Sequence, residues 1–266
     1  MKIYCGSALY RTLTLATHHC ILDFWKTLNA TPDVEMIWGS VEGDADVARA
    51  RNIAASDFLK TDCDVLLTID DDIVFSPRDA LKLCREALDK DMVCGMYLTR
   101  GPTKRQPASL LKDGQTVEFW IDQPLVEIEF LATGFMAVSR RVFEKVAEGL
   151  PLCMQDTDYP FYPFYLQMVI PWPSSVNLYL SEDWAFCQRA KDAGFKLWLD
   201  PTIRLGHIGQ FIWRIDEIDV QPGSPGPVKV EKHGNTTTWL KRPPIPQELI
   251  WTPEINRAER RRLARR

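Results

Sequence analysis

The chain has 266 residues, a net charge of −4, and a composition that is 45% hydrophobic and 26% charged. These values are ordinary for a globular protein and leave room for one large domain, with or without an appendage. The acidic balance gives no electrostatic reason to expect a nucleic-acid partner for the chain as a whole. No window approaches the roughly 18 apolar residues of a membrane span, so we expect none.

Seven cysteines form an odd set without any CxxC pair. This pattern argues against a disulfide framework or a zinc knuckle, because both need paired cysteines at regular spacing. Arg11 and two histidines interrupt the N-terminal segment, which is therefore unlike the apolar core of a signal peptide. We expect a protein of a reducing compartment, in the cytoplasm.

Strands and helices alternate through the first hundred residues. The clearest boundary is the helix that Ser76 caps, with Pro77 at its first position. Hydrophobic periodicity and turn residues predict the remaining elements. The expected helices are 12–28, 46–59 and 76–90, and the expected strands are 1–7, 34–40, 64–70 and 92–100. This alternation is typical of a parallel, doubly wound sheet.

The pattern changes after residue 100. Short β-like pieces precede a helix, and a later helix is closed by Gly194 before one more strand. The expected pieces are 116–121, 126–139, the helix 140–148, the helix 181–194 and the strand 195–200. Residues 151–180 are rich in prolines and aromatics, which indicates an irregular rim and not a part of the core.

The C-terminal residues 216–266 have a different composition. They contain QPGSPGPV and KRPPIP, which favour an extended tail lying on the main domain. The last eleven residues, NRAERRRLARR, carry six arginines against one glutamate. A solvated or frayed helix end is one interpretation of this run, and a contact with phosphates or a membrane surface is the other.

Three adjacent carboxylates, Asp70, Asp71 and Asp72, end the apolar run LLTI of the third expected strand. In an open parallel sheet, ligands collect outside the carboxyl ends of the strands. Adjacent carboxylates repel one another unless a cation or hydrogen-bond donors compensate, and a hard divalent ion held through oxygen is the common solution. The triplet therefore predicts a metal site, with a polar loop as the alternative.

Arg51 is the second candidate, because it lies in the middle of the apolar face of the helix 46–59. A guanidinium in that position needs an anion, since a buried unpaired charge is costly. Its partner could be a structural aspartate, a phosphate or the edge of a nucleotide base. The geometry of the helix leaves these three partners open.

Two later segments carry further polar residues. Ser181, Glu182 and Asp183 stand where any well-capped helix would begin. His207 lies in the segment GHIG, where it could be a ligand or a structural histidine.

Taken together, the order of these segments resembles the GT-A glycosyltransferases, and among them the small family-2-like enzymes of phages and bacteria. The segments that carry the resemblance are ARARNIAASDFL, VLLTIDDDIVF, LATGFMAVSRRVFEKV, SEDWAFCQRAKDAGFKLWLD and GHIG. The resemblance implies an α/β fold with a doubly wound, Rossmann-like mixed sheet. It implies a catalytic domain over 1–215, with a donor-binding half over about 1–100 and an acceptor half over about 101–215. The C-terminal extension 216–266 has no counterpart in it, and a phage-encoded enzyme would work in the host cytoplasm.

The resemblance also implies a metal. Asp72, with Asp70 and His207, would hold Mn²⁺ or Mg²⁺ on the diphosphate of a nucleotide sugar, and a nitrogen ligand favours manganese. The metal would neutralise the departing nucleoside diphosphate, so that the leaving group needs no general acid.

Further site residues follow from the same resemblance. Asp183, or else Glu182, would be the general base that removes a proton from the acceptor hydroxyl of an inverting enzyme. In a retaining enzyme these carboxylates would only bind sugar hydroxyls. The implied donor-binding residues are Ser7, Arg51, Asn52, Asp70, Asp71 and Gly134.

The sequence alone leaves the acceptor and the class of function open. A hydroxymethylated base of phage DNA, a protein and a saccharide are all candidate acceptors; the arginine-rich end favours DNA, and the acidic net charge disfavours it.

Asp70, Asp72 and Val74 also resemble the DxDxV motif of haloacid-dehalogenase-like (HAD-like) phosphatases, where the first aspartate is a nucleophile. That motif normally ends the first strand of its fold, whereas here two strand–helix units precede it. A non-catalytic module that binds a glycan or a nucleotide sugar is the third possibility.

Overall fold

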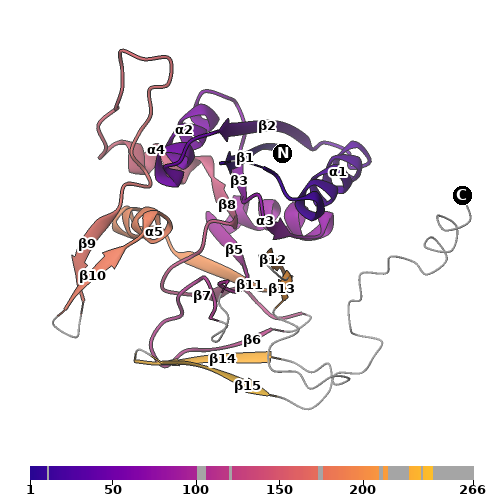
Figure 1. Cartoon of the computed structure of the whole chain (residues 1–266), viewed down its shortest axis with the longest axis vertical. Helices are drawn as coiled ribbons and strands as arrows, with labels where there is room; N and C mark the ends of the chain where they lie inside the picture. The colour runs from indigo at the N-terminus through magenta and orange to yellow at the C-terminus, as the bar shows by residue number, and fades with distance from the viewer. Residues whose placement is uncertain are drawn as a thin grey trace, which may run out of the picture.

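A seven-stranded mixed sheet forms the centre of the molecule, with strand order β2-β1-β3-β8-β5-β11-β7 (Figure 1). The computed structural model describes residues 1–10, 12–100, 106–119, 122–172, 176–209, 212–214, 228–234 and 236–241. The strands of this sheet are β1 (Lys2–Leu9), β2 (Glu35–Glu42), β3 (Val65–Ile69), β5 (Met92–Met96), β7 (Val126–Glu127), β8 (Phe135–Ser139) and β11 (Leu197–Arg204).

The direction of the strands makes the sheet mixed. β1 pairs in parallel with both β2 and β3, and β5 pairs in parallel with β11. β8 lies between β3 and β5 and runs antiparallel to both, and β7 runs antiparallel to β11. The four strands expected in the first hundred residues therefore all point the same way. The predicted fold class, an α/β doubly wound mixed sheet, is confirmed.

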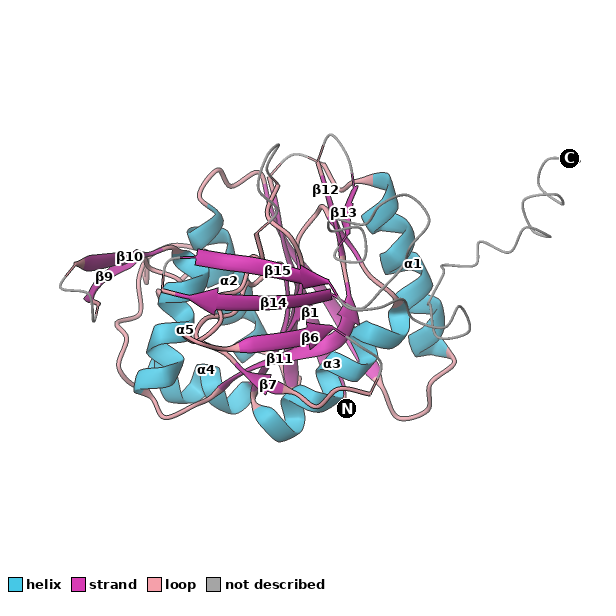
Figure 2. Ribbon diagram, turned by 90° about the horizontal axis from the view of Figure 1, so that it is seen from below, coloured by secondary structure: helices cyan, strands magenta, loops and turns pink. Residues whose placement is uncertain are grey.

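Helices cover both faces of this sheet. In the described part of the chain they are α1 (Leu15–Asn29), α2 (Val47–Leu59), α3 (Pro77–Lys90), α4 (Arg140–Ala147) and α5 (Glu182–Asp192). Figure 2 shows α1 and α3 on one side of the sheet and α2, α4 and α5 on the other. β3 is buried along its whole length because both of its faces meet a helical layer, which explains its unbroken apolar run VLLTI.

Capping residues set the helix starts. The Ser76 hydroxyl accepts a hydrogen bond from the Asp79 N–H at 3.1 Å, with Pro77 next to it, so α3 begins where the sequence predicts. α1 begins later than residue 12, because Thr14 is its N-cap. In α5 the Ser181 hydroxyl makes no hydrogen bond to the helix backbone and donates instead to the Asp183 carboxylate.

The segment 151–180 contributes to the core, and the prediction that it is only a rim is wrong. Phe164 and Tyr165 are fully buried, and the Phe164 ring packs edge-on against Phe143 with 5.1 Å between the ring centroids. A short hairpin of β9 (Met168–Pro171) and β10 (Asn177–Leu180) follows. The prolines interrupt regular structure here, but the aromatic side chains between them still provide the apolar area that the helical layer buries.

Part of the C-terminal extension forms a hairpin of β14 (Val228–His233) and β15 (Thr236–Lys241), which pairs with β6 (Thr116–Phe119) (Figure 1). Val230 in β14 is fully buried in the same apolar cluster as the α2 and α5 side chains. Residues 215–227 and 242–266, with the arginine-rich end, lie outside the described residues. Within the described part, none of the helices is both long and apolar enough for a membrane span.

A small three-stranded sheet of β4 (Ile73–Val74), β12 (Gly206–Ile208) and β13 (Ile212–Arg214) lies beside the end of β3. β12 runs antiparallel to β4, so that His207 stands opposite Ile73. The Ile208 N–H also donates to the Asp72 carbonyl at 2.8 Å. These backbone hydrogen bonds place the late histidine beside the acidic triplet.

Candidate active site

The acidic triplet lies directly beyond the carboxyl end of β3. The Asp70 N–H donates to the Gly134 carbonyl at 2.9 Å, and the Ile73 N–H donates back to the Asp70 carbonyl at 3.3 Å, which closes a turn. The triplet is therefore fixed by β8 on one side and by β12 on the other, and its three carboxylates point into different surroundings.

Asp72 faces His207. The Asp72 Oδ1 and His207 Nε2 atoms are 3.4 Å apart, and both residues are buried. The other ring nitrogen, Nδ1, lies 2.6 Å from the Leu98 carbonyl oxygen. A carbonyl can only accept a hydrogen bond, so Nδ1 carries the proton. In the neutral ring the lone pair is then on Nε2 and faces the Asp72 carboxylate. Metal-binding histidines usually show this arrangement.

Asp70 and Glu182 share Arg51. The Arg51 Nη2 atom lies 2.9 and 3.0 Å from the two Asp70 carboxylate oxygens, and its Nη1 atom lies 2.7 Å from Glu182 Oε1. Burial by itself would lower the pKa of this guanidinium, but the charges of Asp70 and Glu182 outweigh burial and raise the pKa above its ordinary value. Arg51 thus joins the end of β3 to the start of α5 by a charged bridge.

Asp183 has a different environment from Glu182. Its carboxylate accepts hydrogen bonds from the Ser181 hydroxyl and, at 2.8 Å, from the Trp184 N–H. Burial raises the pKa of this carboxyl, and the hydrogen bond from Ser181 offsets only part of the rise. The repulsion of the Glu182 charge adds to it. Asp183 is the carboxyl of the α5 pair whose proton affinity is increased.

Gly134 stands where two side chains meet the backbone. A Cβ atom at this position would lie 2.5 Å from the Tyr97 Oη atom and 3.0 Å from the Asp70 Oδ2 atom. The Gly134 N–H donates to the Tyr97 hydroxyl at 3.1 Å. Burial, and then the Asp70 charge, raise the pKa of the Tyr97 phenol well above its ordinary value. The close packing of Tyr97 and Asp70 therefore explains why this position has no side chain.

Arg100 is a site residue that the sequence analysis missed. Its Nη1 atom lies 2.8 Å from the Asp72 Oδ2 atom, the carboxylate oxygen that does not face His207. The Arg100 side chain is 55% exposed, whereas that of Asp72 is 12% exposed. The sequence around Arg100 looks like that of any surface arginine. Its partner, Asp72, follows β3, whereas Arg100 follows β5, so the local sequence does not reveal the pair.

Among known proteins, similarity to this chain is found in structure. No protein-family model and no curated protein matches the chain. A197 from STIV is similar in structure, with a TM-score of 0.50 and 19% identity over 79% of this chain and 86% of that one. GalNAc-T7, solved with UDP, GalNAc and Mn²⁺, has a TM-score of 0.45 and 14% identity over 78% of this chain and 44% of that one. A glycosyltransferase involved in the glycosylation of the major capsid of PBCV-1 has a TM-score of 0.32 and 12% identity, over 75% and 93%.

The likeness to A197 therefore concerns the doubly wound α/β fold, over 79% of this chain. At identities of 19% and below, likeness in structure extends to the course of the chain and not to its chemistry.

The mixed sheet brings most of the predicted site residues to one end of the molecule. Asp72 lies against His207, and Asp70 is joined through Arg51 to Glu182. Asp70 faces Arg51, so in the described part of the chain there is no cluster of three histidine, cysteine or acidic side chains arranged around one metal position. Two of the three predicted ligands are adjacent.

Three other predicted donor-binding residues already have partners within the chain. Ser7 is buried, and its hydroxyl donates to the Ile69 carbonyl at 2.7 Å. Asn52 is buried, and its Oδ1 atom accepts from the Tyr165 N–H at 2.7 Å.

Asp71 is partly buried, and its backbone carbonyl accepts from the Thr14 N–H at 3.0 Å, which ties the triplet to α1. Burial, and then the Asp72 and Asp70 charges, raise the pKa of the Asp71 carboxyl.

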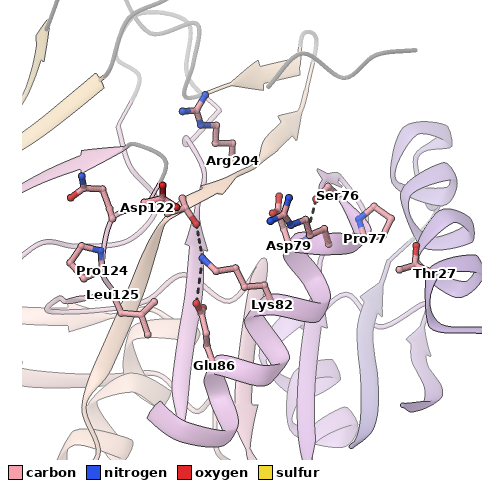
Figure 3. Close-up of a pocket in the computed structure, with 13 residues that line it drawn as sticks. Thr27, Ser76, Pro77, Asp79, Lys82, Glu86, Asp122, Pro124, Leu125 and Arg204 are labelled. Carbon is pink, nitrogen blue, oxygen red and sulfur yellow. Dashed lines mark hydrogen bonds and ion pairs between the residues drawn. The ribbon is translucent and has the colours of Figure 1, made fainter. Parts of the chain in front are cut away.

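A separate polar cavity of about 980 Å³ lies along α3, on the α1 and α3 side of the sheet (Figure 3). None of the predicted site residues lines it. Lys82 there donates to the Thr202 hydroxyl at 2.6 Å and pairs with Glu86 at 3.4 Å and with the fully buried Asp200. Burial, and then the Asp200 charge, raise the pKa of Glu86 to about 7. This cavity is distinct from the carboxylates at the end of β3.

Proposed function

We propose that the protein is a metal-dependent glycosyltransferase, which moves a sugar from a nucleotide-diphosphate sugar to an acceptor hydroxyl. The observation that carries this proposal is the pairing of Asp72 with His207. A buried carboxylate and an imidazole nitrogen face each other at 3.4 Å, and the Leu98 carbonyl fixes the tautomer that leaves the facing nitrogen free to bind a cation.

The residues present fit Mn²⁺ or Mg²⁺, with manganese favoured by the nitrogen donor. Asp72 and His207 would hold the ion, and Asp70 would join them if it exchanged Arg51 for the metal or for a metal-bound water. When bound, the ion would supply positive charge to the diphosphate as it leaves. The three acidic side chains in a row give this end of β3 a surplus of negative charge that suits a divalent cation.

Arg51 and its two partners support the donor side of the proposal. The guanidinium holds Asp70 and Glu182 at fixed positions. Asn52 and Ser7 would act one layer further out: Asn52 positions the Tyr165 backbone, and Ser7 holds the end of β1 against β3. Asn52 and Ser7 would then not touch the donor themselves. The backbone that each of them positions would contact it, as the backbone at Gly134 would.

Asp183 is the better of the two candidate bases. Glu182 is engaged by the buried Arg51 at 2.7 Å, so its carboxylate is not free to take up the proton of an acceptor hydroxyl. The pKa of Asp183 is raised by burial, and a base whose pKa approaches the working pH accepts a proton more readily. We therefore assign deprotonation of the acceptor hydroxyl to Asp183, and a positioning role to Glu182.

A saccharide is the acceptor that the described residues favour, ahead of a protein or a hydroxymethylated DNA base. Tyr159 and Tyr179 are both 63% exposed on the segment 151–180, and exposed aromatic rings stack on sugar rings. The expectation of a DNA acceptor rests on the phage-like resemblance, on the aromatics of 151–180 and on the arginine-rich end, and this end lies outside the described residues. No observation here favours the HAD-like phosphatase, since both oxygens of its would-be nucleophile, Asp70, are hydrogen-bonded to Arg51.

A thermal-shift screen tests the proposal. UDP, GDP, CDP and dTDP sugars are added with and without Mn²⁺, and one donor is expected to raise Tm only when the metal is present. Asp72→Asn and His207→Gln should both abolish that metal-dependent shift. His233→Gln is the matched control, because His233 also lies beside a carboxylate, that of Glu231 at 3.6 Å, but on the exposed hairpin.

The parent and the variant Asp183→Asn distinguish an enzyme from a binding module. The parent with its donor and Mn²⁺ should release the nucleoside diphosphate slowly by hydrolysis, and Asp183→Asn should bind the donor normally while losing turnover. A donor shift that survives in Asp72→Asn would contradict the metal site, and a parent that binds without any turnover on a panel of saccharides would favour the binding module.

A further inference from the structure

The ion pair between Arg100 and Asp72 is not explained by a metal site alone. The two carboxylate oxygens of Asp72 face different groups: Oδ1 faces the His207 Nε2 atom at 3.4 Å, and Oδ2 faces the Arg100 guanidinium at 2.8 Å. A divalent cation beside Oδ1 would stand close to a guanidinium that already neutralises the same carboxylate. Two like charges at one carboxylate repel each other, so cation and guanidinium compete for Asp72.

The backbone that carries Arg100 also orients His207. Leu98 holds the histidine through its carbonyl, and the next residue, Thr99, is fixed by the hydrogen bond from its N–H to the Gln106 carbonyl at 2.8 Å. The main chain before Arg100 is thus anchored at the site, while the arginine side chain itself is 55% exposed. A long exposed side chain on a fixed base can change partners at little cost, because exposed ion pairs are weak.

We infer that Arg100 is a displaceable counter-ion. It neutralises Asp72 while no divalent cation is bound, and it moves to the diphosphate of the donor when the cation takes its place. This inference rests on the proposed function, since the partner that Arg100 gains is the donor diphosphate. A planar guanidinium with several N–H donors suits phosphate oxygens as well as it suits a carboxylate.

The exchange makes the cation and the nucleotide bind cooperatively. Without nucleotide, the cation must displace Arg100 from Asp72, and the arginine gains nothing in return. With nucleotide, the displaced arginine finds the diphosphate, so each ligand strengthens the binding of the other by the same factor. The site would consequently stay closed to free cations and would take up the metal together with its donor.

The test measures Mn²⁺ affinity directly, by titration followed by electron paramagnetic resonance, with and without UDP. Arg100→Ala should bind Mn²⁺ alone more tightly than the parent, by about two- to fivefold, which is the range expected when a weak ion pair no longer competes. The gain in Mn²⁺ affinity on adding UDP should shrink in this variant. Arg49→Ala is the matched control, because Arg49 is a half-exposed arginine of α2 whose partner, Asp44, does not belong to the site.

The outcomes separate this inference from the proposed function. If the parent binds Mn²⁺ through Asp72 but Arg100→Ala binds it no more tightly, Arg100 is not a competitor, and the inference fails while the metal site stands. If the parent binds no Mn²⁺ but binds UDP through Arg100, the arginine replaces the metal permanently, and both the exchange and the metal dependence fall. Unchanged coupling between UDP and Mn²⁺ in Arg100→Ala would also overturn the exchange.

Discussion

Replacing Arg51 with methionine should destabilise the protein strongly. The Arg51 side chain is 9% exposed, and its partners Asp70 and Glu182 are 28% and 19% exposed. Methionine has a similar length but no charge, so the variant leaves two partly buried carboxylates without a cation. Removal of one partner from a buried ion pair typically costs about 3–5 kcal/mol. Because both carboxylates keep some solvent, we expect a loss of about 3 kcal/mol in the free energy of unfolding.

Arg49→Met is the matched control on the same helix. Arg49 also donates two hydrogen bonds to an aspartate, Asp44, at 2.6 and 2.7 Å, but its side chain is 50% exposed. Although the Asp44 side chain is only 9% exposed, water reaches the pair through Arg49, so we expect the pair to contribute no more than an exposed pair does, about 0–1 kcal/mol. Urea denaturation of the parent and both variants at pH 7.5 should therefore give a loss in Arg51→Met that is several times the loss in Arg49→Met.

The difference between the two variants identifies the cause of the loss. Both substitutions remove the same charged group from α2, and what differs is how far water reaches the ion pair. Equal losses in the two arginine variants would refute the buried-charge explanation.

Three further substitutions test other parts of the structure. Gly134→Ala should cost about 1–3 kcal/mol and lower donor affinity, because the new Cβ would lie 2.5 Å from Tyr97 Oη; an unchanged Tm would contradict this contact. Asn52→Ala should cost about 1–3 kcal/mol, measured by urea denaturation, because the buried Tyr165 N–H loses its acceptor. Burial raises the pKa of Glu86 in the folded protein to about 7, from about 4.5 in the unfolded chain. The protonated Glu86 therefore stabilises the fold fully below pH 4.5, and this stabilisation is lost as pH rises through 7. From pH 5 to 8 the parent should therefore lose about 2–3 kcal/mol more than Glu86→Gln, and parallel pH profiles would exclude this.

Much of the fold was predictable from local patterns. The start of α3 follows from Ser76 and Pro77, and the position of the acidic triplet follows from the end of the apolar run of β3. The place of β8 could not be predicted, because the apolar run FMAVS indicates burial on both faces but does not indicate which strands pair with it or in which direction. Prolines made 151–180 look like a rim, although Phe164 belongs to the core.

The site was predictable in part for the same reason. The need of Arg51 for an anion follows from the apolar face of α2, but its choice of Asp70 and Glu182 depends on the tertiary structure. The proximity of Asp72 and His207 was expected from the resemblance to GT-A enzymes and is found. Arg100 was missed because its ion pair joins the segments that follow β5 and β3, two strands that are far apart in the sequence and lie on either side of β8 in the folded sheet.

The position of β8 also affects how the chain can be synthesised. The strand that joins β3 to β5 ends at Ser139, and β11, the other neighbour of β5, ends at Arg204. At about 5–20 residues per second, a ribosome needs several seconds after finishing β5 to deliver these strands. During that time the nascent chain carries β3 with an open edge and β5 without a neighbour, which are sites for pairing with other chains. Chaperone supply during translation should therefore affect the yield of this protein.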